Sequence, residues 1–280
     1  MKVGIIGSGT MGVGIAQAFA QAGDNFEVVF CGVRNSLESP TRGRDKIKAS
    51  LDKRVAKGKM EAEAAEKIVA RIIPSLREDL KDCDLIIEAG KEEMGLKKEV
   101  FQDLDSFCKE DAIFATNTSS LSVTEIANGL NHKFVGLHFF NPVPVMKLVE
   151  IIPGFNTDQE VVDKMVELSK EIGKEPVVVK EYAGFVVNRI LIPMINEAVG
   201  LFAEGISTAE GIDTAMKFGA NHPMGPLELG DLIGLDVCLA IMETLFDETK
   251  DSKYRPHPLL VKMVRGNHLG RKTGVGFYQY

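Results

Sequence analysis

The sequence contains few cysteines and no paired cysteine motif. Its four cysteines form no CxxC pair and share no spacing with a histidine pair: Cys31, Cys83, Cys108 and Cys238. We therefore expect neither a disulfide framework nor a bound metal ion, because both need matched ligand spacings. This cysteine usage is typical of a reducing compartment, and we expect a cytoplasmic protein.

Two further features are missing: a long uninterrupted apolar run and an excess of positive charge. The longest apolar stretch, FVVNRILIPMINEAVGLF, is interrupted by Asn188, Arg189, Asn196 and Glu197, so we expect no membrane span. Lys and Arg number 33 against 40 Asp and Glu, and the net charge of −7 argues against nucleic acid as the main partner. The 280 residues are 45% hydrophobic, enough for the cores of two domains.

Short apolar runs alternate with helical patterns over the first two thirds of the chain. They predict strands at 2–6, 26–30, 84–89, 112–117, 133–139, 148–152 and 176–180. This alternation predicts an α/β fold with a Rossmann-type, doubly wound parallel sheet. Two helical patterns, roughly 43–57 and 61–73 on either side of Gly58, are more than one crossover needs and predict a projecting helical hairpin.

The strand signals end near Tyr182, and the rest of the chain is predicted to be helical. The expected helices cover 186–204, 208–218, 235–248 and 258–265, with a kink or shift at Pro193. We therefore expect two domains, residues 1–182 with the sheet and residues 183–280 entirely helical.

A GxGxxG motif follows the first predicted strand, formed by Gly7, Ser8, Gly9, Thr10, Met11 and Gly12. Gly7 allows a tight turn, Gly9 lets the backbone approach a pyrophosphate, and Gly12 permits close packing of helix on sheet. The N-terminus of the following helix offers N–H groups to phosphates. The motif in this context indicates a dinucleotide site.

The acid that usually holds the cofactor ribose is missing. It is expected about 20 residues after the glycine loop, where this chain has Gly32. No carboxylate there repels a 2′-phosphate, and Arg34 could pair with it. Other nearby donors are Asn35, Ser36, Arg42 and Arg44. NADP is therefore favoured over NAD; the alternative is that Arg34 is a surface residue and that backbone or water holds the ribose.

The segment GLHFFNPVPVMKLVEII, residues 136–152, holds the strongest catalytic candidates. His138 ends an apolar strand pattern, where ligand crevices open in such sheets. Glu150 lies within an apolar strand and needs a partner, since a lone buried charge costs several kcal/mol. His138 is an economical partner, because a carboxylate fixes the imidazole tautomer. The alternative for His138 is an ordinary core histidine.

The first helix of the predicted hairpin has a polar strip beside its apolar face. Lys46, Ser50, Lys53 and Lys57 fall together at helical spacing. The strip is either a solvated face or a docking strip for a phosphate-bearing ligand.

Several segments together resemble the L-3-hydroxyacyl-CoA dehydrogenase family, and within it the bacterial 3-hydroxybutyryl-CoA dehydrogenases. They are GSGTMGVGIAQAFA, ATNTSSLS, GLHFFNPVPVMKLVEII, GFVVNRILIPMINEA, NHPMGPLELGDLIGLD and GRKTGVGFY. They span both predicted domains and nearly the full length. The one clear departure from NAD-using members is Gly32, where those members carry aspartate. Some clostridial-type members that use NADP show a similar Gly-x-Arg.

The resemblance implies a role for each matching residue. His138 would be the general base, oriented by Glu150, while Ser119 and Asn188 would hydrogen-bond the reacting oxygen and thioester region. The implied cofactor contacts are Glu92, Lys97, Ser119, Asn141 and Lys272. The implied CoA contacts are Ser50, Lys53, Lys57 and Ser119. Bland alternatives stay open: Ser119 could cap the helix beginning near Ser122, Asn188 could bridge within a buried helix, and Glu92 and Lys97 could be solvated charges.

The implied activity is reversible hydride transfer between NADP(H), or NAD(H), and acetoacetyl-CoA or 3-hydroxybutyryl-CoA. An acyl-CoA substrate and a homodimer follow from the resemblance. Two alternatives remain: a dehydrogenase of another 3-hydroxy acid, and a non-catalytic nucleotide-binding protein of the same fold.

Overall fold

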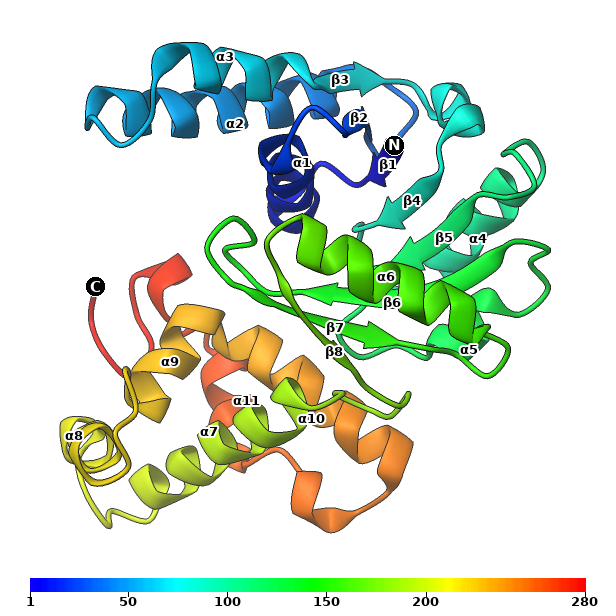
Figure 1. Cartoon of the computed structure of the whole chain (residues 1–280). Helices are drawn as coiled ribbons and strands as arrows, with labels where there is room; N and C mark the ends of the chain where they lie inside the picture. Colours follow the sequence, from blue (N-terminus) through cyan, green and yellow to red (C-terminus); the bar gives the residue numbers. More distant parts are fainter. The chain divides into compact units, whose positions relative to one another are not determined.

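An eight-stranded sheet is the centre of the first of two units in this chain (Figure 1). The computed structural model describes all residues from Met1 to Tyr280, and its contacts divide it into Met1–Glu181 and Tyr182–Tyr280. The strands are β1 (Lys2–Ile6), β2 (Glu27–Cys31), β3 (Ile72–Ser75), β4 (Leu85–Glu88), β5 (Ile113–Thr116), β6 (Lys133–Phe139), β7 (Leu148–Ile152) and β8 (Glu175–Val178).

The strand order confirms the Rossmann-type prediction. The order is β3-β2-β1-β4-β5-β6-β7-β8, and its first six strands are parallel in the doubly wound order. β7 then runs antiparallel to β6, and β8 runs parallel to β7. The carboxyl ends of β1, β2, β4, β5 and β6 therefore share one edge of the sheet, where ligands bind in such folds.

Helices cover both faces of this sheet. On one face α1 (Thr10–Ala22) and α6 (Gln159–Glu171) share a core with alternate strand residues such as Ile5 and Ile87. On the other face α4 (Met94–Asp105) brings Phe101 against Phe114 and Phe134, with ring centroids 5.6 and 4.7 Å apart. Figure 1 shows α6 in front of β6–β8 and α4 behind the sheet. The short helix α5 (Val123–Ala127) follows β5.

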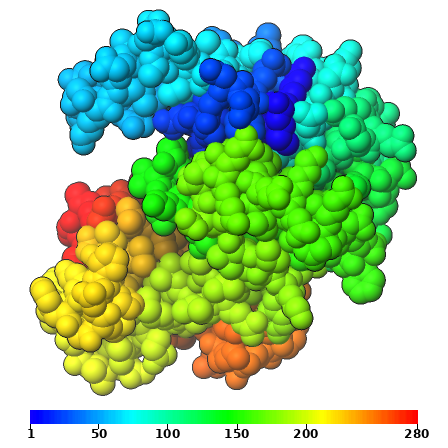
Figure 2. All heavy atoms as spheres, viewed as in Figure 1, coloured from blue at the N-terminus to red at the C-terminus, as the bar shows by residue number.

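The predicted hairpin is present as α2 (Glu38–Ala56) and α3 (Ala62–Ala70), which lie side by side in Figure 1. Its turn passes through Gly58, whose φ of +64° is a left-handed conformation that suits glycine. In the space-filling view the light-blue atoms of this hairpin form a ridge at the edge of the first unit (Figure 2). Ile47 and Leu51 of α2 are buried, as the apolar period predicts.

One strand was absent from the sequence prediction. The helix expected over 61–73 is wrong at its end, because α3 stops at Ala70 and Ile72–Ser75 pairs with β2 as an edge strand. β-branched Ile72 and Ile73 favour the extended chain, and Pro74 is tolerated at a sheet edge. α2 also begins at Glu38, earlier than the expected residue 43.

The second unit is entirely helical, as predicted. It contains α7 (Val187–Ala203), α8 (Ala209–Gly219), α9 (Pro226–Ile233), α10 (Leu235–Thr249) and α11 (Pro258–Arg265). α9 was not predicted; it is short, and Pro226 occupies its first turn, where a missing N–H costs nothing. α7 continues through Pro193 without a break in the helix.

Two buried aspartates tie the C-terminal segment of the second unit to its helices. Asp213 accepts hydrogen bonds from the Leu227 N–H and the Tyr278 hydroxyl, at 2.8 and 2.7 Å. Asp231 accepts from the Phe277 and Tyr278 N–H groups, at 3.1 and 3.0 Å. Burial raises the pKa of Asp231, and the charge of Asp213 adds to the increase. These contacts hold the segment that carries Lys272.

Candidate active site

The glycine loop is shaped by two close backbone contacts. Gly7 has φ of +111°, and a Cβ there would lie 2.5 Å from the Ala89 carbonyl oxygen at the end of β4. A Cβ on Gly12 would lie 1.7 Å from the Gly7 carbonyl oxygen, so the first turn of α1 rests directly on the loop. Both positions therefore require glycine. A Cβ on Gly9 would meet nothing within 4 Å, which leaves that backbone open to a ligand.

The N-terminus of α1 fits the phosphates of a dinucleotide. Its N-cap is Gly9, which has no side chain that could occupy the N–H groups of the first turn. Val13 N–H bonds to the Gly9 carbonyl, whereas the N–H groups of Thr10, Met11 and Gly12 make no hydrogen bond within the chain. Unpaired N–H groups at a helix N-terminus bind anions. Ser8 lies in the same loop, next to these donors.

The loop after β2 closes tightly around Gly32. A Cβ there would lie 2.3 Å from the Ser39 Oγ and 3.0 Å from the Arg34 carbonyl oxygen. Arg34 is exposed and makes no ion pair within the chain. Asn35 is occupied: its Nδ2 donates to Glu78 at 3.0 Å, and its Oδ1 accepts from the Arg77 N–H at 2.9 Å. Of the nearby donors proposed from sequence, Arg42 pairs with Glu38 at 3.6 Å.

His138 and Glu150 face each other on neighbouring antiparallel strands. They are direct register partners of β6 and β7, and His138 Nδ1 lies 2.7 Å from Glu150 Oε2. Glu150 is fully buried and His138 is 6% exposed. Because an ionised carboxylate can only accept, Nδ1 carries the proton and Nε2 is the basic nitrogen. The expected pairing is therefore present in the structure.

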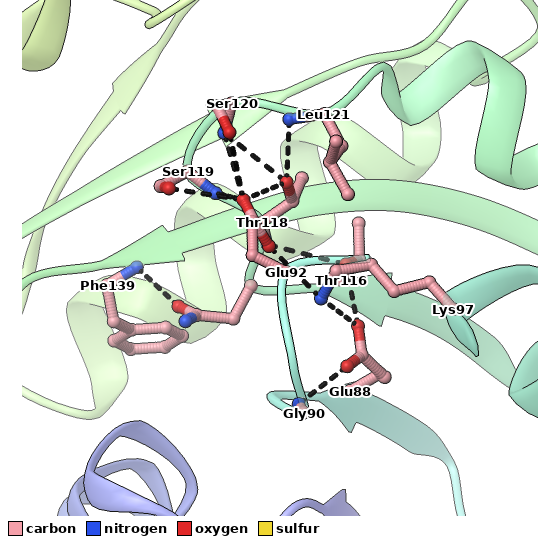
Figure 3. A network of polar contacts seen from close by, with 11 residues as sticks. Glu88, Gly90, Glu92, Lys97, Thr116, Thr118, Ser119, Ser120, Leu121 and Phe139 are labelled. Atoms are coloured by element: carbon pink, nitrogen blue, oxygen red, sulfur yellow. Dashed lines mark hydrogen bonds and ion pairs between the residues drawn. The ribbon is translucent and has the colours of Figure 1, made fainter. Parts of the chain in front are cut away.

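A polar network joins the ends of β4 and β5 and involves Glu92 and Lys97 (Figure 3). Lys97 in the first turn of α4 is 2% exposed and pairs with Glu88 at 2.7 Å and Glu92 at 3.3 Å. Burial raises the pKa of Glu92, but the Lys97 charge and hydrogen bonds from Thr118 and Ser119 outweigh it, so the pKa is lowered. The interpretation of Lys97 as a solvated charge is wrong, whereas Glu92 is an exposed residue whose carboxylate is nevertheless held by this network.

Ser119 lies in the loop between β5 and α5, within the same network. Its N–H and Oγ donate to Glu92 Oε1 at 2.7 and 3.1 Å (Figure 3). The cap of α5 is Ser122, whose Oγ accepts from the Glu125 N–H at 3.1 Å. Ser119 therefore does not cap this helix, and that alternative is wrong.

The loop between β6 and β7 is held by a lysine that the sequence did not single out. Lys174 is 7% exposed, and its ammonium donates to the carbonyl oxygens of Val143 and Met146 at 2.5 and 2.8 Å. Burial lowers the pKa of this amine. Asn141, near the start of the same loop, is exposed. Val143 packs closely against α1, because a Cβ on Gly14 of that helix would lie 2.8 Å from the Val143 Cβ.

Comparison with known proteins agrees with this arrangement. Residues 2–182 match the model of the 3-hydroxyacyl-CoA dehydrogenase NAD binding domain, and residues 184–280 match the C-terminal domain of the same proteins. The chain belongs to the 3-hydroxyacyl-CoA dehydrogenase family. Members are oxidoreductases that act on CH–OH groups with a nicotinamide cofactor, which confirms the predicted enzyme class.

Individual members of this dehydrogenase family are similar over the full chain. A 3-hydroxybutyryl-CoA dehydrogenase of Clostridioides difficile is 58% identical, with 100% of this chain and 99% of the relative covered. The human mitochondrial hydroxyacyl-coenzyme A dehydrogenase is 42% identical over 99% of this chain and 90% of its own. The crystal structure of (S)-3-hydroxybutyryl-CoA dehydrogenase from Ralstonia eutropha superposes with a TM-score of 0.93 at 46% identity, covering 100% of this chain and 98% of that one.

The remaining predicted residues lie on the hairpin and in the helical unit of this dehydrogenase. Ser50 and Lys53 are exposed on α2, Lys57 is exposed as the C-cap of this helix, and neither lysine forms an ion pair. Asn188 is 9% exposed in the first turn of α7. Lys272 lies in a short 3-10 turn and pairs with Asp236. None of the helices combines the length with the apolar character that a membrane span requires, and no cluster of His, Cys, Asp or Glu is arranged to hold a metal.

Proposed function

We propose that this enzyme interconverts acetoacetyl-CoA and (S)-3-hydroxybutyryl-CoA with NADP(H) as the favoured cofactor. The observation that carries the proposal is the buried pair of His138 and Glu150, 2.7 Å apart at the end of a Rossmann sheet. The relatives from Clostridioides difficile and Ralstonia eutropha, which are named for this substrate, support the choice of acyl group. NAD(H) is the alternative cofactor.

We assign the proton transfer of the reaction to His138. Its Nε2 takes the proton of the substrate 3-hydroxyl in oxidation and returns it in reduction, while Nδ1–H stays bonded to Glu150. Glu150 orients the ring and offsets the positive charge that the ring gains. Ser119 and Asn188 are proposed to hydrogen-bond the reacting oxygen and the thioester. A bound nicotinamide supplies the hydride acceptor or donor.

The cofactor is proposed to lie along the carboxyl edge of the sheet. The free N–H groups at the start of α1 bind its pyrophosphate. Glu92, Asn141, Lys97 and Lys272 are proposed to contact the nicotinamide half. Lys97 is only 2% exposed, and its ammonium group already pairs with Glu88 and Glu92.

The 2′-phosphate of NADP is proposed to meet Arg34. The loop at Gly32 carries no carboxylate, and the Arg34 guanidinium has no competing ion pair. NADPH would favour the reductive direction, toward (S)-3-hydroxybutyryl-CoA in a butyrate-forming route. A test compares KM for NADPH and NADH in wild type and Arg34→Ala, with Arg265→Ala, an exposed arginine at the end of α11, as control. A KM for NADPH that Arg34→Ala leaves unchanged excludes this contact.

CoA is proposed to dock on the exposed strip of α2. Lys53 and Lys57 present two unpaired ammonium groups there, and Ser50 adds a hydroxyl. A dehydrogenase of a free 3-hydroxy acid has no use for this strip. Replacing both lysines with alanine should therefore raise the KM for acetoacetyl-CoA at least tenfold and leave the KM for NADPH unchanged. Lys67→Ala on α3, an exposed lysine paired with Glu63, is the matched control.

The catalytic proposal itself is tested with His138→Gln. Turnover should fall by roughly 10²-fold to 10⁴-fold, the usual contribution of a general base, with nucleotide binding retained. Undiminished turnover would rule out His138 as the general base. A homodimer is also proposed for this enzyme, and sedimentation analysis would test it.

A further inference from the structure

Glu88 is a buried acid at the end of an apolar strand, and no role in the proposed reaction has been given to it. Only 2% of the residue is exposed, and both of its side-chain oxygens accept hydrogen bonds from other groups of the protein. Oε1 accepts from the Gly90 N–H at 2.6 Å. Oε2 accepts from Lys97 Nζ at 2.7 Å and from Thr116 Oγ1 at 2.9 Å. Thr116 is its register partner on β5, so two strand ends meet at this carboxylate.

Lys97 connects this sealed carboxylate to a partly exposed one. Its side chain is 2% exposed and lies between Glu88 and Glu92, which is 36% exposed (Figure 3). Lys97 binds Glu92 through Oε2 at 3.3 Å. Burying an ammonium group is costly unless carboxylates offset it. Of the two carboxylates, Glu88 is the one shielded from water, so its charge offsets that of the Lys97 ammonium group without competition from solvent.

The other oxygen of Glu92 holds the loop of Ser119. Oε1 accepts from Thr118 Oγ1 at 2.7 Å, from the Ser119 N–H at 2.7 Å and from the Ser120 N–H at 3.1 Å (Figure 3). The hydroxyls of Ser119 and Ser120 also donate to it, at 3.1 and 3.3 Å. One oxygen therefore binds the loop while the other is fixed by Lys97.

We infer that Glu88 is a positioning residue for the cofactor side of the active site. It holds Lys97 in place, and Lys97 in turn orients the Glu92 carboxylate that shapes the 118–120 loop. Glu88 touches neither cofactor nor substrate and acts only through these two residues. This inference rests on the proposed function, because Glu92 is proposed there as a cofactor contact and Ser119 as a contact to the reacting substrate.

Glu88→Gln is the most direct perturbation. It keeps the shape and the acceptor for the Gly90 N–H but removes the charge that compensates Lys97. Misplacement of binding groups by about 1 Å costs up to roughly 10²-fold, so we expect NADPH to bind about tenfold to a hundredfold more weakly in a fluorescence titration. The KM for acetoacetyl-CoA should rise by a smaller factor, because the loop carries the proposed substrate contact Ser119 while the proposed CoA strip of α2 is unchanged. Glu99→Gln, the same change at an exposed site of α4, should leave both unchanged.

Hydrogen exchange of the cofactor-free protein gives a second readout that does not depend on the reaction. The Ser119 and Ser120 amides, which donate to Glu92, should exchange faster in Glu88→Gln, as in Glu92→Gln. Amides of α6 should keep their wild-type rates. Equal exchange at Ser119 and Ser120 in wild type and Glu88→Gln would overturn the inference.

A double-mutant cycle shows whether Glu88 acts through Lys97. In the Lys97→Met background, Glu88→Gln should weaken NADPH binding less than twofold further. A further tenfold loss would mean that Glu88 acts independently, which contradicts the inference. If Glu88→Gln alone does not fold, the double variant, which buries no unpaired charge, is compared with Lys97→Met in the same way. Failure of wild type to bind either nucleotide would instead refute the proposed function.

Discussion

We expect that replacing Gly32 with aspartate does not by itself shift the proposed cofactor preference from NADPH to NADH. A Cβ at this position would lie 2.3 Å from the Ser39 Oγ, 3.0 Å from the Arg34 carbonyl oxygen and 3.5 Å from Pro40 Cδ. Contacts under about 3.0 Å force a shift, and overpacking of this kind costs about 1–3 kcal/mol. At roughly 2–4 °C for each kcal/mol, Gly32→Asp alone should lower Tm by about 2–12 °C.

Adding Ser39→Ala removes the shortest of these contacts. The double variant Gly32→Asp with Ser39→Ala should recover most of the lost Tm and place a carboxylate where the 2′-phosphate is proposed to lie. Two unit charges 4 Å apart at an effective dielectric constant of 20 repel by about 4 kcal/mol, equivalent to roughly 10³-fold. We therefore expect the KM for NADPH to rise by about 10²-fold to 10³-fold, and the KM for NADH to stay equal or fall.

The assay is the initial rate of acetoacetyl-CoA reduction over a range of NADPH and NADH concentrations, with Tm measured on the same preparations. Ser39→Ala alone is the reference variant. If the double variant melts within a few degrees of this reference and its KM for NADPH is within twofold, no 2′-phosphate binds at this loop. Arg34 would then be a surface residue, and another part of the chain would select the cofactor.

Three further outcomes test the site. Glu150→Gln should lower kcat by roughly 10²-fold or more while nucleotide binding is retained, because His138 keeps its place but loses its compensating charge; a kcat within threefold of wild type would refute the pairing. Gly12→Ala should weaken NADPH binding and lower Tm, since its Cβ would lie 1.7 Å from the Gly7 carbonyl; unchanged nucleotide titrations and melting curves would contradict this. The pKa of Glu92 is lowered, so its stabilising effect is complete above the ordinary value of 4.5 and is lost as pH falls through the folded value; Glu92→Gln should flatten that part of the Tm-against-pH curve.

Local motifs made most of the fold predictable from the sequence. The glycine loop lies between a strand and a helix, as GxGxxG requires, and the four-residue apolar period of α2 lies on its buried face. β3 was missed because Ile72–Ser75 is only four residues long and continues the apolar pattern of α3. Its pairing with β2 is a long-range contact, which overrides the local helical period.

The site was predictable where one residue type demanded another. An acid among apolar residues required a partner, and this led from Glu150 to His138. Glu88 in DLIIEA shows the same signal, an acid at the end of an apolar strand. Its partner Lys97 could not be predicted, because no sequence rule pairs a strand end with a residue nine positions later in the following helix. Lys174 was out of reach, because its partners are backbone carbonyls.

The antiparallel pairing of β6 with β7 makes the proposed base and its carboxylate a marker of strand register. His138 and Glu150 are directly opposite, so they share one face of the sheet. Removing or adding one residue in β7 alone would turn Glu150 to the opposite face, because side chains alternate along a strand. The register of β7 against β6 is therefore under a constraint that neither residue shows by itself. Enzymes of this kind should tolerate substitution at the exposed residues 144–147 far better than a single-residue insertion or deletion in either strand.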